Sequence, residues 1–167
     1  MKSNELLQDA FGRIRDTVGA TLEGVDDESL VRRPEGNGNS IAWLIWHLSR
    51  VEDVQLASVA GVEQVWTSQD FASRFNLPLP ERDTGYGHSS DKVDAVQAPP
   101  ELLLEYYDAV HRQTVAFLET LGDKDLDRIV DTRWDPPVTL GVRLVSTIAD
   151  CLQHVGQAAY AKGLGGL

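Results

Sequence analysis

Cysteine is almost absent from this sequence, because its 167 residues contain only Cys151. A lone cysteine excludes an internal disulfide bond. Thiol-disulfide chemistry usually needs a second cysteine or an activating cation, and the sequence shows neither beside Cys151. A catalytic thiol next to Asp150 is one alternative, but unpaired cysteines are more often small buried hydrophobic residues. We therefore expect Cys151 to pack in the core.

Long apolar runs and basic clusters are also lacking. No stretch approaches the ~20 apolar residues of a membrane helix. The segment 1–5 has no apolar signal region and carries an early acidic residue. The net charge is −11 without a basic patch, which disfavours contact with nucleic acid and anionic membranes. We expect a cytoplasmic protein that acts on a small-molecule substrate, with no nucleic-acid and no membrane partner.

Apolar residues recur at helical spacing in four long segments, and the chain length suits one domain, residues 1–167. The expected helices cover residues 4–23, 41–60, 99–121 and 140–162. Ser40 and Thr139 stand where N-caps belong, and prolines open the third helix. This pattern predicts an all-α protein, an antiparallel four-helix bundle with a long crossover between the second and third helices.

The segments between these helices are less regular. Residues 61–99 contain prolines, glycines and aromatic residues, so we expect a structured crossover with a short helix at Thr67–Phe75. Residues 123–134 are expected to form a polar connection with at most a short turn.

The last predicted helix carries Asp150 and His154, four residues apart. Such residues lie on one helix face, one turn apart, and Gln157 continues the same polar stripe. An apolar stripe runs beside it, so these polar groups reach the edge of the core, where an unpaired charge is costly. A metal ion is one partner that would satisfy both side chains. An ordinary exposed Asp–His pair is the alternative.

Helical bundles build metal sites from side chains on facing helices. His47 lies on the flank of the second helix's apolar face and is the natural third ligand, although a satisfied core histidine is the alternative. Two histidines and a carboxylate leave coordination positions open, which is typical of a catalytic site. His111 could border the same cavity and His88 could line its mouth, or both could be ordinary exposed residues.

Three stretches make the sequence resemble the DinB-like superfamily: NSIAWLIWHLSRVED (39–53), GYGHSS (85–90) and DCLQHVGQAAYAKGL (150–164). The resemblance covers essentially the whole chain. It implies a four-helix-bundle metalloprotein related to mycothiol-dependent maleylpyruvate isomerase and the bacillithiol transferases. By position it implies that a divalent metal, zinc or nickel, is held by His47, Asp150 and His154. The acid here is Asp, one methylene shorter than Glu, and Gln157 falls where it can orient a ligand.

The resemblance implies a metal-dependent transferase or isomerase that uses a low-molecular-weight thiol, such as mycothiol, on a small electrophile. Aromatic residues are candidates for an apolar wall beside the metal, or else plain core: Trp43, Trp46, Tyr86 and Tyr107. The alternatives are a metal-dependent hydrolase, a non-haem iron protein and a non-enzymatic metal-binding stress or interaction protein. Because members of the superfamily are often dimers, a homodimer is also expected. The sequence assigns no general acid or base.

Overall fold

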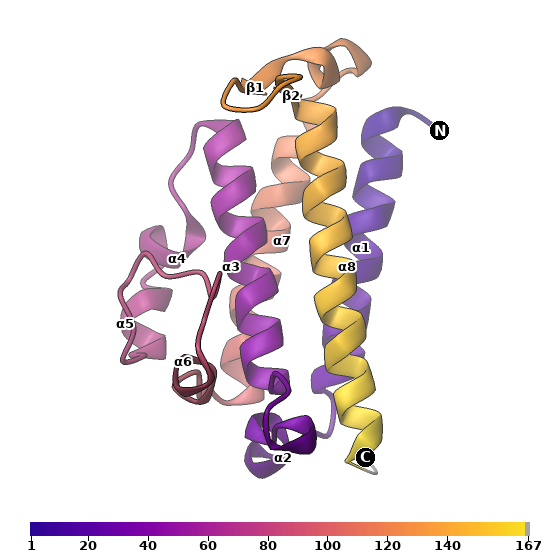
Figure 1. Cartoon of the computed structure of the whole chain (residues 1–167). Coiled ribbons are helices and arrows are strands. Elements are labelled where there is room, and N and C mark those ends of the chain that lie inside the picture. The colour runs from indigo at the N-terminus through magenta and orange to yellow at the C-terminus, as the bar shows by residue number, and fades with distance from the viewer. Residues whose placement is uncertain (166–167) are drawn as a thin grey trace.

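Four long helices pack side by side in the computed structural model, which describes residues 1–165 (Figure 1). The predicted all-α four-helix bundle with a long crossover is confirmed. Within the described residues, no helix combines the length and the apolar character needed to span a bilayer. The long helices are α1 (Ser3–Leu22), α3 (Ile41–Ala60), α7 (Pro100–Glu119) and α8 (Leu140–Leu164).

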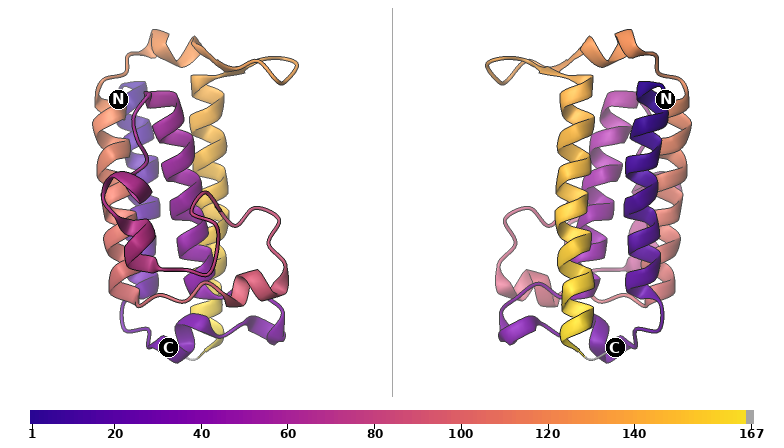
Figure 2. Two further views of the ribbon diagram at one scale, coloured as in Figure 1. Left: turned by 90° about the vertical axis from the view of Figure 1, so that its left-hand side faces the viewer. Right: turned by 90° about the vertical axis from the view of Figure 1, so that its right-hand side faces the viewer.

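The crossover decides which helices run in the same direction. It leaves the end of α3, descends along the side of the bundle and returns to the end where α3 began (Figures 1 and 2). As a result α3 and α7 run parallel, whereas α3 and α8 are antiparallel neighbours. This arrangement places the middle of α3 against the middle of α8, where the predicted ligands lie.

Local signals in the sequence set the helix ends. The Ser40 hydroxyl accepts a hydrogen bond from the Trp43 amide at 3.2 Å and caps α3. That helix ends at Gly61, whose φ of 70° is left-handed. The Thr139 hydroxyl caps α8 by accepting from the Val142 amide at 3.3 Å. These caps fix where the two ligand-bearing helices begin.

The connections hold more structure than the sequence predicted. The expectation of one short helix over Thr67–Phe75 was wrong, because the left-handed Asp70 (φ 59°) separates two helices. A two-stranded antiparallel hairpin replaces part of the expected polar connection. The short elements are α2 (Asp27–Val31), η1 (Pro34–Gly36), α4 (Val65–Ser68), α5 (Phe71–Phe75), α6 (Ser90–Asp94), η2 (Asp123–Asp127), β1 (Ile129–Asp131) and β2 (Val138–Thr139).

The apolar core encloses the carboxyl group of Glu52 on α3, which is 0% exposed. The Tyr107 hydroxyl donates to Glu52 Oε2 at 2.8 Å, and the Thr114 hydroxyl donates to Oε1 at 2.7 Å. Burial raises the pKa of Glu52 to about 7. Cys151 is fully buried as predicted, and burial raises the pKa of its thiol, so this thiol stays protonated at neutral pH.

Because of Glu52, the free energy of unfolding should fall as the pH rises. The unfolded chain releases this proton near pH 4.5, whereas the native protein keeps it up to about pH 7. Unfolding between these values therefore releases a proton, and the free energy of unfolding drops by about 3 kcal/mol over that interval. Glu52→Gln removes this slope, which urea unfolding from pH 4.5 to 8 would measure. Glu119→Gln, a matched change at an exposed position, should keep it; an unchanged slope in Glu52→Gln would contradict the assignment.

Candidate metal centre

Three side chains from two helices converge at the contact between α3 and α8. His47 comes from α3, and Asp150 and His154 come from α8; one donor atom of each lies within 4.8 Å of the other two. Zinc ligands at bond lengths of 2.0–2.1 Å are about 3.3 Å apart, so small side-chain rotations would close the remaining gap. The structure thus brings together the three residues singled out in the sequence.

The core fixes the rotation of α8 that makes this possible. Cys151 and Val155 follow the two ligand candidates in sequence and point into the core. With these two positions buried, Asp150 and His154 lie one turn apart on the adjacent face, toward α3. His154 Nε2 is 3.7 Å from Asp150 Oδ1.

The ring of His47 is held by a backbone carbonyl of the crossover. His47 Nδ1 contacts the carbonyl oxygen of Thr84. A carbonyl can only accept, so Nδ1 carries the proton and Nε2 keeps its lone pair. Burial lowers the pKa of His47, and nearby His154 lowers it further, against the opposing effects of Thr84 and Asp150. A neutral imidazole is the form that binds a metal.

The two side chains on α8 complete a donor set. His154 Nδ1 donates to Gln157 Oε1 at 3.1 Å, which leaves Nε2 as the free nitrogen. Asp150 Oδ2 is buried and has no hydrogen-bond partner within residues 1–165. A buried carboxylate oxygen without a partner is costly, and a cation would satisfy it. Two imidazoles and a carboxylate match the ligands of zinc, nickel or iron.

A glycine lets the crossover approach the ring of His47. Gly85 has a φ of +93°, and a Cβ there would lie 2.6 Å from His47 Nδ1 and 3.0 Å from Trp43. Two requirements therefore coincide at this position: a backbone conformation that favours glycine and the absence of a side chain.

Gly85→Ala should weaken metal binding as well as stability. The positive φ alone costs roughly 1–2 kcal/mol, and the added methyl group must push Thr84 away from His47. Gly87→Ala is the matched control, since Gly87 has a φ of +70° but faces open space. We expect both variants to lose stability in thermal unfolding and only Gly85→Ala to lose metal affinity in a chelator competition. Equal affinities would argue against this contact.

Trp43 and His88 form the wall behind His47. The Trp43 ring stacks on His47 with centroids 4.6 Å apart and planes 15° apart. His88 was expected at the mouth of the site or exposed, and both expectations were wrong. Its side chain is only 1% exposed and lies behind Trp43, where Nδ1 accepts from the Trp43 indole at 3.1 Å.

The other predicted pocket residues lie elsewhere. His111 on α7 stacks with Tyr107, and burial together with nearby Arg15 on α1 lowers its pKa. The Tyr107 hydroxyl donates a hydrogen bond to Glu52 in the core, and Tyr86 is 92% exposed at the tip of the loop. The structure does not bring these three residues into the wall. Trp46 is buried and packs against His88, one layer behind Trp43.

The comparisons with known proteins agree with this architecture. A crystal structure described as a conserved protein of locus from Enterococcus faecalis shares 31% identity with this chain, with a TM-score of 0.90. The similarity covers 97% of this chain and 96% of that protein. No curated protein matches the sequence. The family model of the DinB superfamily matches residues 10–158, and the chain therefore belongs to the DinB superfamily.

Proposed function

We propose that this protein is a metal-dependent enzyme that joins a low-molecular-weight thiol to a small electrophile. In this proposal His47, Asp150 and His154 hold a divalent zinc or nickel ion. The observation that supports it is the convergence of three donor groups, one with a buried oxygen that lacks a partner. Three protein ligands leave coordination positions for an exchangeable molecule, unlike a closed structural site.

A bound divalent ion would lower the pKa of a thiol that coordinates it, so that thiolate forms at neutral pH. The chain's own residues set the conditions for this. Asp150 offsets one of the two positive charges, and the neutral imidazoles add none, which leaves a site suited to one anionic sulfur. Trp43 and His47 form a stacked aromatic face beside it.

The nucleophile must come from outside the chain. Cys151 is next to Asp150 in sequence, but its sulfur is fully buried and lies 3.7 Å from the Leu48 carbonyl. Burial raises the pKa of this thiol, so it is not a thiolate at neutral pH. A diffusible thiol, such as mycothiol, would lose its proton to solvent and form a carbon–sulfur bond with the electrophile. With an aryl chloride the carbon–chlorine bond breaks and chloride leaves; with a maleyl compound the carbon–carbon π bond breaks and the neighbouring carbon takes a proton from solvent.

A hydrolase would instead need a base to activate water. Asp83, which directly precedes Thr84 in the crossover, already accepts hydrogen bonds from the Gly85 amide and from His88. Its carboxylate is therefore occupied by hydrogen bonds within the loop, and the structure offers no support for it as a general base.

Metal content and thiol dependence test the proposal together. We expect elemental analysis of the purified protein to find an equimolar zinc or nickel ion, and calorimetry to detect binding of mycothiol or bacillithiol. Turnover of a chlorinated dinitrobenzene or a maleyl compound should require the thiol.

Ester hydrolysis without thiol would instead support a hydrolase, and metal binding without thiol affinity would support a metal-binding protein. Oxygen consumption by an iron form would support a non-haem iron enzyme. His111→Ala, on α7, is the control that should keep full activity.

A further inference from the structure

Segment 83–88 of the crossover forms a chain of hydrogen bonds that leads to His47. Asp83 Oδ1 accepts from the Gly85 amide at 3.1 Å and from His88 Nε2 at 2.9 Å. A carboxylate only accepts, so His88 Nε2 carries a proton. His88 Nδ1 is then the acceptor for the Trp43 indole N–H, at 3.1 Å. The chain of contacts thus runs from Asp83 through His88 to Trp43.

The chain continues from Trp43 to the ring of His47. The stacked Trp43 indole limits the tilt of that ring, since the two planes differ by only 15°. The Thr84 carbonyl fixes its rotation and its tautomer through Nδ1. Thr84 lies directly after Asp83, so both constraints originate in the same short segment of the crossover.

We propose that Asp83 and His88 are positioning residues, which hold Trp43 and Thr84 against His47 so that its Nε2 faces Asp150 and His154. The inference rests on the proposed metal-dependent function, because it assigns a task to His47 as a ligand. Partners that orient a ligating histidine from behind commonly set its basicity and direction.

His88 acts through its neighbours and does not touch a substrate. Its side chain is 1% exposed, and both ring nitrogens are engaged. Trp46 stacks on its ring with centroids 5.9 Å apart. A histidine enclosed in this way has neither an accessible nitrogen nor room to move, which suits an orienting role.

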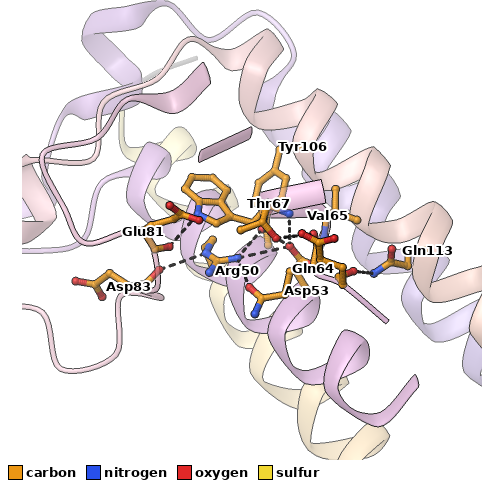
Figure 3. A network of polar contacts seen from close by, with 12 residues as sticks. Arg50, Asp53, Gln64, Val65, Thr67, Glu81, Asp83, Tyr106 and Gln113 are labelled. Carbon is orange, nitrogen blue, oxygen red and sulfur yellow. Dashed lines mark hydrogen bonds and ion pairs between the residues drawn. The ribbon is translucent and has the colours of Figure 1, made fainter. Parts of the chain in front are cut away.

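Helix α3, which carries His47, also holds segment 83–88 in place. Arg50 lies three residues after His47 on α3, and its Nε donates to the Asp83 carbonyl at 3.2 Å (Figure 3). Its Nη1 donates to Gln64 and to the Tyr106 hydroxyl, at 3.1 and 3.2 Å. The ligand and its orienting loop are therefore attached to one rigid element, which keeps their relative positions fixed.

Two variants interrupt the chain at different points. Asp83→Ala removes the hydrogen bonds from the Gly85 amide and from His88, together with a 3.5 Å ion pair to the half-exposed Lys92. Asp83 lies in a loop outside the bundle core, so folding should be retained. His88→Phe keeps a ring but removes the acceptor for Trp43. Trp66→Phe is the control: it deletes the 2.9 Å hydrogen bond from the Trp66 indole to the Glu81 carbonyl and keeps an aromatic ring beside Arg50. It therefore weakens the crossover at a bond outside the chain from Asp83 to His47.

Zinc affinity, measured by competition with a chromophoric chelator, should fall roughly 10–100-fold in Asp83→Ala and His88→Phe. It should stay near wild type in Trp66→Phe even at an equal loss of thermal stability. A second measurement uses the metal-free protein. In a long-range ¹H–¹⁵N spectrum, wild-type His47 should show a single Nδ1–H tautomer, and the two variants should show a mixture.

The inference is overturned if Asp83→Ala and His88→Phe keep both the wild-type zinc affinity and the single tautomer. It is also overturned if Trp66→Phe loses as much affinity as they do. The metal-free spectrum separates this inference from the proposed function. A wild-type protein that binds neither zinc nor nickel would refute the proposed function, while a tautomer mixture in the variants would still support the positioning of His47.

Discussion

His154→Ala is expected to remove specific metal binding while leaving the fold intact. The side chain is 19% exposed, and its hydrogen bond goes to Gln157 on the same helix, so its loss should leave the core undisturbed. Only His47 and Asp150 would remain, one from each helix. Because loss of an outer orienting partner alone costs roughly 10–100-fold in affinity, we expect loss of a direct ligand to exceed about 100-fold.

Metal-dependent stabilisation measures this effect. At a metal concentration about 1,000 times the dissociation constant, binding to the native state stabilises it by about 4 kcal/mol. Thermal unfolding of the wild type should therefore shift upward when zinc or nickel is added. In His154→Ala, a 100-fold loss of affinity leaves at most about 1.4 kcal/mol of this stabilisation, so the shift should be much smaller under the same conditions.

Two further variants should lose less metal affinity than His154→Ala. Gln157→Ala leaves all three donors and removes only the partner of His154 Nδ1, so it should lose an intermediate part of the affinity. His111→Ala should match the wild type, because His111 lies beside Tyr107 on α7. A full metal-induced shift in His154→Ala would place the ion somewhere other than between α3 and α8.

The long helices and the convergence of the three residues could be predicted because both depend on helical periodicity. Asp150 and His154 are four residues apart, so any helix through them puts both on one face. His47 follows from the apolar pattern of α3, since the buried positions around it fix the direction in which that helix presents its flank. Facing helices in a bundle then leave few ways to arrange these side chains.

The partners of His47 could not be predicted, because they come from a segment without periodicity. Thr84 contacts the imidazole through its backbone carbonyl, for which side-chain identity gives no signal. His88 was expected near the surface because it stands in a glycine-rich loop, but tertiary contacts with Trp43 and Asp83 bury it. The glycines at 85 and 87 were the only local sign that this loop folds back closely.

Asp53→Ala is expected to destabilise the protein by about 3–5 kcal/mol, as is typical when one partner of a buried ion pair is removed. Asp53 is fully buried on α3, and its Oδ2 lies 3.5 Å from Arg50 Nη1. The Val65 and Trp66 amides each donate to this carboxylate at 2.8 Å, so it fixes the start of α4 (Figure 3). The Tyr106 hydroxyl also donates to it, at 2.8 Å.

The charge balance explains why this loss should be so large. Burial raises the pKa of the Asp53 carboxyl, and the hydrogen bonds and Arg50 oppose that rise. The carboxylate is therefore stable only while its donors are in place. Without it, two backbone amides lose their acceptor, and the guanidinium of Arg50, only 1% exposed, loses its counter-charge.

Urea unfolding of Asp53→Ala, Asp53→Asn and Glu105→Ala would test this account. Asn keeps the side-chain volume and one carbonyl acceptor but removes the charge, so its loss should be smaller than that of Ala. Glu105→Ala breaks an exposed ion pair with Arg74 and should matter far less, because water screens both groups. Since Arg50 also holds the Asp83 carbonyl, Asp53→Ala should weaken zinc binding too. Equal stability of the two alanine variants would mean that the Arg50–Asp53 pair does not support the crossover, and the loop against His47 would need another anchor.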